Sequence, residues 1–143
     1  MLIGFGRDDL PDLAPLPQHY GAACELAAPL GAVIATGHTA TDQVETILYR
    51  LAASPGRRAL LGMAADGPAP AGCGARATAV RLVRPLLAVT REETAAYCAE
   101  RGLPYREDPI NASDAYARNR LRAGLLPALR AIHPAAEANV LRT

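Results

Sequence analysis

The first half of the chain has two segments with apolar residues at helical spacing. A short, continuously apolar segment lies between them. Residues 18–29 carry apolar side chains at helical intervals, which predicts a helix. Gly31–Thr36 is apolar, rich in β-branched residues and closed by Gly37, which predicts an interior strand followed by a turn. Helical spacing returns from about Asp42 to Ala53. This order predicts one α-β-α layer of a parallel sheet.

Helix breakers interrupt the pattern before it returns in the second half. Ser, Pro, Gly and two Arg occupy residues 54–58, and Ala, Gly and Pro dominate residues 64–74, which predicts a flexible surface loop there. Arginines alternate with hydrophobic residues in 79–84, which predicts a second strand. Thr90 and the acid-rich turn after it predict a helix that runs to Glu100.

The C-terminal part of the pattern predicts an irregular segment and then helix. Two prolines exclude a continuous helix in residues 103–111, so their polar groups are presented from loop backbone. A helix is expected over 116–132, bent or interrupted at Pro127, with an apolar face made by Leu121, Leu125 and Leu129. We therefore divide the chain into an irregular lead-in (1–17), a partial α/β domain (18–114) and a basic helical extension (115–143).

Composition narrows the class of protein only a little. The chain has 143 residues, half of them hydrophobic, which supports one ordinary domain that need not be complete. All 15 basic residues are arginine and the net charge is +1, so overall charge indicates no particular partner. Residues 115–143 differ, because 5 arginines stand against one acid, Glu137, for a local charge of +4.

The cysteines and the apolar runs predict a location. Cys24, Cys73 and Cys98 are widely spaced, with no Cys-x-x-Cys and no paired histidines, so we expect neither a zinc site nor a disulfide. Reduced cysteines fit a cytoplasmic protein best. We find no signal peptide and no apolar run near the ~18 residues of a membrane span, so we expect no membrane association.

The candidate chemistry concentrates in His38-Thr39-Ala40-Thr41-Asp42-Gln43-Val44-Glu45-Thr46, where the first strand meets the next helix. Open α/β sheets place their sites at such junctions. Asp42 and Glu45 share a helix face near its amino end, where two carboxylates could hold a divalent cation or a substrate ammonium. The same spacing also suits a capping box, with Asp42 accepting from first-turn amides and Glu45 reaching back. His38 is either a buried, hydrogen-bonded histidine or a catalytic one.

Three later segments present arginine or polar side chains near the ends of predicted elements. They contain Arg84, Asp108 to Asn111, and Arg118 to Arg122. Guanidinium groups at such positions could clamp the phosphates of a nucleotide or of RNA. Taken singly, each is better explained as a solvated or ion-paired surface residue.

Taken together and in order, these motifs resemble the N-terminal domain of the tRNA(Ile)-lysidine synthetase (synthase) family, from about residue 19 to residue 134. The matching motifs are Gly37-His38 with Asp42-Gln43-x-Glu45-Thr46, Arg84-Pro85-Leu86-Leu87, Glu107-Asp108-Pro109-x-Asn111 and Arg118-Asn119-x-x-Arg122. The resemblance implies an α/β fold with a partial, doubly wound parallel sheet of the PP-loop (adenine nucleotide alpha hydrolase-like) type, followed by a C-terminal helical segment.

The resemblance also implies an activity. Family members use ATP with Mg²⁺ to adenylate O2 of the wobble cytidine in tRNA(Ile) with a CAU anticodon, and L-lysine then displaces AMP. By position in the motifs, Asp42 and Glu45 are the catalytic carboxylates, and Gly37 and His38 contact the nucleotide. The remaining matched residues contact substrate or tRNA, or fix the loop that does so: Arg84, Asp108, Asn111, Arg118, Asn119 and Arg122. No set of metal ligands is assigned.

Two departures from the family pattern change the expectation. Thr41 stands where members usually carry a second acid beside Asp42. The family's nucleotide loop, Ser-Gly-Gly-x-Asp-Ser, does not occur in these 143 residues. Our hypothesis is therefore a partial catalytic domain without the first βαβ unit, which by itself does not adenylate tRNA. Whether that unit is encoded upstream or supplied by a partner stays open.

Other functions and states are compatible with the same residues. One alternative is a non-catalytic tRNA- or RNA-binding module that descends from a PP-loop enzyme and keeps the basic C-terminal helix. A thiolating PP-loop enzyme would need cysteines, often a Cys-x-x-Cys pair, which this chain does not contain. Because a sheet without some of its strands exposes an unpaired edge, we also expect self-association or a missing N-terminal segment.

Overall fold

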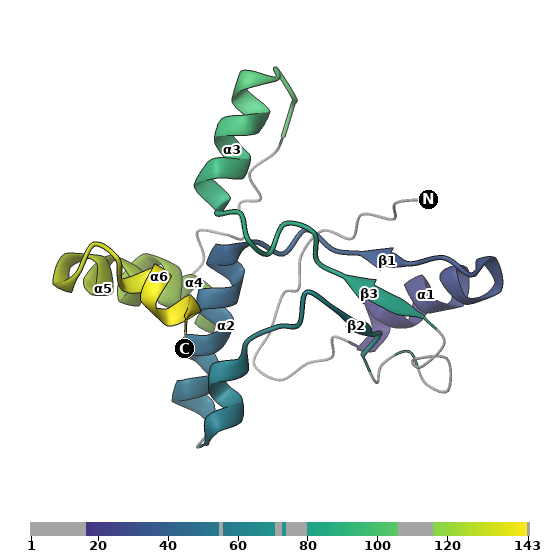
Figure 1. Ribbon diagram of the computed structural model, residues 1–143, viewed down its shortest axis with the longest axis horizontal. Helices are drawn as coiled ribbons and strands as arrows, with labels where there is room; N and C mark the ends of the chain where they lie inside the picture. Colours follow the sequence, from purple (N-terminus) through teal and green to yellow (C-terminus); the bar gives the residue numbers. More distant parts are fainter. Residues whose placement is uncertain (1–16, 55, 71–72, 74–79, 106–115, 143) are drawn as a thin grey trace. The chain divides into compact units, whose positions relative to one another are not determined.

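The computed structural model describes residues 17–54, 56–70, 73, 80–105 and 116–142 (Figure 1). Contacts divide the chain into two compact units, of which unit 1 is Met1–His38 with Ala64–Pro85 and unit 2 is Thr39–Met63 with Leu86–Thr143. The elements in chain order are α1 (Pro17–Ala27), η1 (Ala28–Leu30), β1 (Ile34–Ala35), α2 (Ala40–Ala53), η2 (Arg57–Leu61), β2 (Asp66–Pro68), β3 (Arg81–Val83), α3 (Arg91–Glu100), α4 (Ala117–Arg120), η5 (Leu121–Leu125), α5 (Leu126–Ile132) and α6 (Ala136–Leu141).

Unit 1 packs α1 against a small sheet (Figure 1). The helix residues that enter its core are small, so the helix backbone can approach the strands closely. The sheet contributes larger aliphatic side chains that fill the remaining space. The buried core consists of Ala23, Cys24 and Ala27 from the helix and Ile34, Ala69, Cys73, Val80 and Leu82 from the strands and the segments beside them.

The sheet has the order β1-β3-β2. The first strand is parallel to β3, with Ile34 opposite Leu82, which is the parallel pairing that the sequence predicts. Beyond the strand, the Thr36 N–H donates to the Val83 carbonyl at 3.0 Å and extends the ladder. Both strands are shorter than the sequence runs that predict them, residues 31–36 and 79–84.

The third strand, β2, corrects the expectation of a flexible loop over residues 64–74. Residues 66–68 pair antiparallel with β3, so the sheet is mixed rather than purely parallel. The Ala69 N–H donates to the Val80 carbonyl at 2.9 Å, and Ala69 itself is buried. These contacts run through the backbone, so a reading based on side-chain composition does not detect them.

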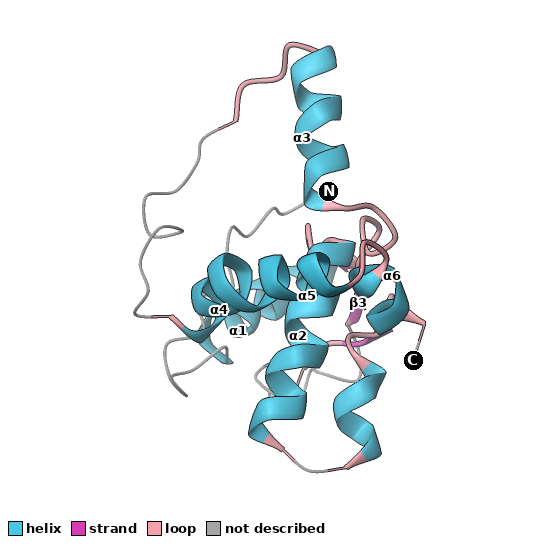
Figure 2. Cartoon of the chain, turned by 90° about the vertical axis from the view of Figure 1, so that its left-hand side faces the viewer, coloured by secondary structure: helices cyan, strands magenta, loops and turns pink. Residues whose placement is uncertain are grey.

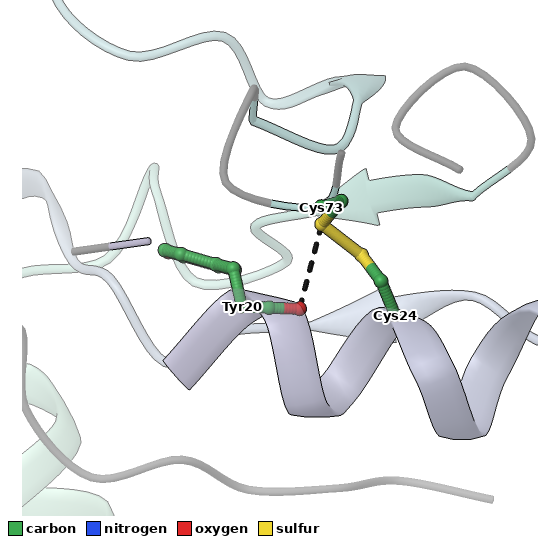
Figure 3. Close-up of a disulfide and its surroundings, with 3 residues drawn as sticks. All are labelled: Tyr20, Cys24 and Cys73. Atoms are coloured by element: carbon green, nitrogen blue, oxygen red, sulfur yellow. Dashed lines mark hydrogen bonds between the residues drawn. A yellow bond between two sulfur atoms is a disulfide. The ribbon is translucent and has the colours of Figure 1, made fainter. Parts of the chain in front are cut away.

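A disulfide joins Cys24 of α1 to Cys73, whose Cα atoms lie 5.7 Å apart (Figure 3). The expectation that the chain contains no disulfide is therefore wrong. The two cysteines are 49 residues apart in sequence, and β2 and the turn after it bring the second one back to α1. The spacing of the cysteines in the sequence does not indicate that Cys73 folds back onto α1. Cys98 is a free cysteine on α3.

Unit 2 is helical in its described part, and α2 packs against α4, η5 and α6 (Figure 2). Val44 and Ile47 are the large aliphatic residues that α2 buries.

The side-chain amide of Gln43 donates to the Met63 carbonyl at 2.9 Å and accepts the Met63 N–H at 2.6 Å. Gly62 has φ +58°, and a Cβ there would lie 2.7 Å from Cδ of Gln43. Only glycine therefore suits this turn.

Residues 117–132 form one helical stretch with a π-helical turn, η5, at its centre. Pro127 has no N–H to donate to the preceding turn, so the expected interruption is confirmed. At this turn the Leu126 N–H donates to the Leu121 carbonyl five residues back, which shifts the helix register by one residue. Leu126 is consequently buried and Leu125 exposed, so the predicted apolar face is wrong at Leu125.

The helix α3 begins where its cap signal predicts. The Thr90 side chain accepts the Glu93 N–H, and the Glu93 carboxylate accepts the Thr90 N–H in return, which completes a capping box. No residue of α3 is buried. Within the described ranges, no helix is long and apolar enough to cross a membrane.

Candidate functional site

The first turn of α2 carries the candidate carboxylates in a register that the sequence does not predict. The helix begins at Ala40 with Thr39 as its cap. Oδ2 of Asp42 accepts the Thr39 N–H at 2.6 Å and the Thr39 hydroxyl at 2.7 Å. The capping box is thus Thr39 with Asp42, and the predicted box of Asp42 with Glu45 is wrong. The Thr39 hydroxyl starts the helix one turn earlier, which leaves Glu45 free of any capping role.

Glu45 points into unit 2 and is only 2% exposed. Its Oε1 accepts Nε of Arg122 at 2.8 Å and lies 2.7 Å from Nη2 of the same guanidinium. Its other oxygen, Oε2, accepts Nε of Arg118. A buried carboxylate is tolerated only where it is paired and hydrogen-bonded, and both of its oxygens meet that condition.

Asp42 joins the same group through its second oxygen. Its Oδ1 accepts Nη2 of Arg118, and Nη2 of Arg122 lies 3.9 Å away. We call Asp42, Glu45, Arg118 and Arg122 the charge cluster. Its formal charge is zero, so each partly or fully buried charge has an opposite charge beside it. Asp42 is its more accessible acid, with 16% of the side chain exposed against 2% for Glu45.

Two helical spacings produce the charge cluster. The acids stand three residues apart on α2, and the arginines stand four apart on α4 and η5, so each pair occupies one helix face. Asn119 lies between the two arginines and is buried. The sequence contains a signal for this pairing. Two acids share one face of a predicted helix, and two arginines share one face of another. Taken motif by motif, the arginines indicate phosphate contacts or surface ion pairs, and neither interpretation predicts this buried pairing.

The charge cluster favours an organic cation over a metal ion. Its carboxylate oxygens already accept from guanidinium groups, and an ammonium could replace one such donor without a new coordination sphere. Across the residues that the structure describes, no group of three or more His, Cys, Asp or Glu side chains could hold a metal ion. The described residues therefore offer no Mg²⁺ site made of three or more protein ligands.

Thr41, which stands where the family pattern has a second acid, has a structural partner. It is buried, and its hydroxyl accepts the Arg91 N–H of α3 at 3.2 Å. The first turn of α2 thereby supplies an acceptor to one of the free amides that begin α3. Sequence reasoning missed this contact, because it joins residues 50 positions apart.

Unit 1 holds a second set of candidate residues, where its two parallel strands end. The Thr36 hydroxyl and Nδ1 of His38 lie 2.8 Å apart, and Thr36 is buried. Nη1 of Arg84 donates to the Ala64 carbonyl at 2.7 Å. Nε of Arg84 is buried and has no hydrogen-bond partner in the described part of the chain. Because β1 and β3 are parallel neighbours, Thr36 and Arg84 lie at the same edge of the sheet.

The predicted site residues are thus distributed over both units. The structure brings the charge cluster and Asn119 together in unit 2, and it places Gly37, His38 and Arg84 in unit 1. Gly37 is exposed, and a Cβ there would meet no atom within 4 Å, so its turn does not require glycine. Asp108 and Asn111 lie outside the described residues.

Comparison with known proteins identifies the class. A family model described as the PP-loop domain matches residues 20–129. The chain belongs to the PP-loop domain family, and its α/β core with the parallel β1–β3 pair agrees with the fold class that the sequence predicts.

The particular relatives are more specific, because they are tRNA(Ile)-lysidine synthases. The chain is 47% identical over 140 residues to that of Salinispora tropica, which covers 96% of this chain and 40% of the relative. It is 42% identical over 128 residues to that of Dehalococcoides mccartyi (87% and 26%) and 41% identical over 115 residues to that of Parasynechococcus marenigrum (80% and 33%). The chain spans less than half the length of each of these relatives. The resemblance drawn from the motifs is confirmed.

Proposed function

We propose that this chain supplies the lysine-handling part of a tRNA(Ile)-lysidine synthase. That ligase uses ATP to join L-lysine to the wobble cytidine of tRNA(Ile) with a CAU anticodon. Membership of the PP-loop family and the names of the relatives support the reaction class. The observation that carries the assignment to these residues is the buried Glu45 carboxylate, which lies beside the more accessible Asp42 and has arginines as its ion-pair partners.

The chemistry needs a group that binds lysine as an ammonium and then accepts a proton, because only the neutral amine attacks carbon. We assign the ammonium contact to Asp42, whose Oδ1 is the outer acceptor of the charge cluster. Glu45 is assigned a positioning role, because it holds Arg118 and Arg122 on the inner side of the cluster. The bound ammonium would take over the contact that Nη2 of Arg118 makes with Asp42.

We place nucleotide contacts in unit 1. Gly37, His38 and Arg84 follow strands that end at the same sheet edge, where α/β folds of this type bind nucleotides. The contact between the Thr36 hydroxyl and Nδ1 of His38 orients the His38 ring. The part of the chain that the structure describes holds no group of three or more ligands for Mg²⁺.

The alternative of a non-catalytic RNA-binding module is less well supported by the charge cluster. It requires Arg118 and Arg122 to face phosphates, whereas both guanidinium groups contact Glu45. It also expects Asp42→Ala to leave RNA binding unchanged. Because Asp42 accepts from Arg118, that substitution alters an arginine in either case, and RNA affinity does not separate the two functions. Lysine binding separates them, because only the first function requires it.

The test is calorimetric titration of the chain with L-lysine and with L-norleucine, which has the same carbon chain without the ε-ammonium. We expect lysine to bind and norleucine not to bind. Asp42→Asn should weaken lysine binding roughly tenfold to a hundredfold, because a charge-assisted hydrogen bond is lost. Glu92→Gln, which neutralises an exposed acid on α3, is the matched control and should leave lysine affinity unchanged.

Two results would contradict the proposal. Equal binding of lysine and norleucine would mean that no carboxylate binds the ε-ammonium group of lysine. Lysine binding that Asp42→Asn leaves intact would move the ammonium site away from the charge cluster. Circular dichroism of each variant shows whether a lost affinity reflects a lost fold.

A further inference from the structure

The Cys24–Cys73 pair lies outside the residues that the proposed function uses. Both cysteines are buried in the core of unit 1, at 1% and 8% exposure. Figure 3 shows the two sulfur atoms directly over the first turns of α1, with the Tyr20 carbonyl beside Cys73. Nothing in the chemistry of the charge cluster accounts for this pair.

The Tyr20 carbonyl oxygen lies 3.4 Å from Sγ of Cys73. A sulfur in a disulfide has no hydrogen to donate, whereas a thiol donates weakly to an oxygen at this distance. The acceptor is thus in place for the reduced form. The surrounding core is also suited to free thiols, which pack as small hydrophobic groups beside Ala23 and Ala27. The apolar core and the Tyr20 carbonyl therefore suit the thiol form as well as the disulfide.

The position of the bond in the chain gives it a structural consequence. The 49-residue separation encloses β1, all of α2 and β2, and thus encloses Asp42 and Glu45. Closing a loop of this length removes many conformations from the unfolded chain. It also ties the end of the β2 segment to α1 within unit 1.

We propose that Cys24 and Cys73 are a reversible redox pair, oxidised by low-molecular-weight disulfides and reduced by the corresponding thiols. Cys73 is the more exposed residue of the two, so its thiol meets the small disulfide first. Its thiolate attacks one sulfur of the disulfide, which breaks that S–S bond, releases one small thiolate and leaves a mixed disulfide on Cys73. The Cys24 thiolate then attacks the Cys73 sulfur and expels the second small thiolate.

Electrons and protons balance in this thiol–disulfide exchange. Two protein thiols lose two electrons and two protons, and the small disulfide gains both and becomes two small thiols. Reduction is the same sequence in reverse. No metal and no further oxidant is needed.

The test equilibrates the chain with defined ratios of reduced to oxidised glutathione, starting from both the reduced and the oxidised protein. Acid quenching, alkylation in denaturant and mass spectrometry then count the free thiols. We expect all 3 cysteines to be alkylated in the reduced chain and Cys98 alone in the oxidised chain. Both starting states should converge on one oxidised fraction at each ratio.

Matched variants assign the bond. Cys98→Ala should titrate as the wild type does, and Cys73→Ser should form no intramolecular disulfide. Oxidation should raise the Tm of the wild type and of Cys98→Ala by roughly 10 °C, and should not raise that of Cys73→Ser. If Cys73→Ser does not fold, peptide mapping of the wild-type bond makes the same assignment.

Three results would overturn the proposal. They are 3 alkylated thiols at every glutathione ratio, a bond that maps to Cys98, and a Cys24–Cys73 bond that no ratio reduces while the chain stays folded. All readouts are thiol counts, peptide maps and melting temperatures, so their failure is distinct from a failure of lysine binding.

Discussion

At the scale of single residues, Glu45 shows how a charge becomes part of a protein interior. Two guanidinium groups satisfy both of its oxygens, and the neighbouring Asp42 balances the second positive charge. Such a cluster adds little stability over an apolar core, but it is costly to leave half complete. The residue is therefore expected to be sensitive to the loss of its charge alone, at nearly constant volume.

Glu45→Gln should lower the free energy of unfolding by about 3 kcal/mol, because it leaves Arg118 and Arg122 with Asp42 as their partner in the charge cluster. Urea denaturation followed by circular dichroism measures this loss. Glu137→Gln is the matched control in the same unit. Its partner Arg130 is 47% exposed, so we expect a loss of about 1 kcal/mol or less. Equal losses in the two variants would contradict the buried pairing.

At the scale of elements, the helix caps decide where side chains point. In α2, Thr39 rather than Asp42 begins the helix, and that choice turns Glu45 inward. In the helical stretch of residues 117–132, the π-helical turn before Pro127 exchanges Leu125 for Leu126 as the buried residue. A shift of one to three residues in register therefore changes the face that an element presents.

The cap of α3 has a testable pH dependence. The Thr90 N–H and hydroxyl donate to Oε2 of Glu93 at 2.7 and 2.8 Å, and these hydrogen bonds hold the pKa of Glu93 below its usual value. A lowered pKa means that the cap contributes fully above the ordinary glutamate pKa and is lost as the pH falls through the lowered value. Helix α3 should therefore fray first at its amino end under acid conditions.

Carbon-detected NMR titration of the Glu93 carboxyl group measures this pKa directly. Thr90→Ala should return the pKa of Glu93 toward its usual value, because the hydroxyl donor is removed and the cap geometry is lost. Protection of the first-turn amides of α3 should fall over the same pH range in the wild type. If Thr90→Ala leaves the pKa of Glu93 unchanged, the capping box does not lower that pKa.

At the scale of the whole molecule, two units divide the candidate chemistry. Unit 1 holds the sheet, the disulfide and the candidate nucleotide contacts, and unit 2 holds the charge cluster. The chain crosses between the units after residues 38, 63 and 85. A covalent change inside one unit should therefore act mainly on the elements of that unit.

Hydrogen exchange with mass spectrometry checks this division. Reduction of the Cys24–Cys73 bond should speed exchange in α1 and in the three strands, because the tie between them is lost. Exchange in α5 and α6 of unit 2 should change little. Cys98→Ala should show the same pattern. Equal acceleration in both units would mean that they unfold as one cooperative body.

The sequence by itself determined the elements with strong local signals. Apolar spacing predicted α1, α2 and the helical stretch of residues 117–132, the Thr90 cap signal predicted α3, and β-branched and alternating runs predicted β1 and β3. The order of four short motifs indicated the family, which the PP-loop match over residues 20–129 confirms. These features depend on neighbours within one or two turns or on residue order, so they can be read without coordinates.

Three features came from the tertiary structure only: the antiparallel β2 strand, the Cys24–Cys73 bond and the Thr41–Arg91 contact. The charge cluster also needed it, because the acid and arginine spacings indicate pairing without fixing which partners meet. Each of these four features joins residues at least 13 positions apart. Local sequence specifies which side chains a helix or strand presents, but the partner that each side chain meets depends on how distant segments fold back. Burial then enforces that partnership, because a charge or a backbone amide removed from water must be satisfied by whatever lies beside it.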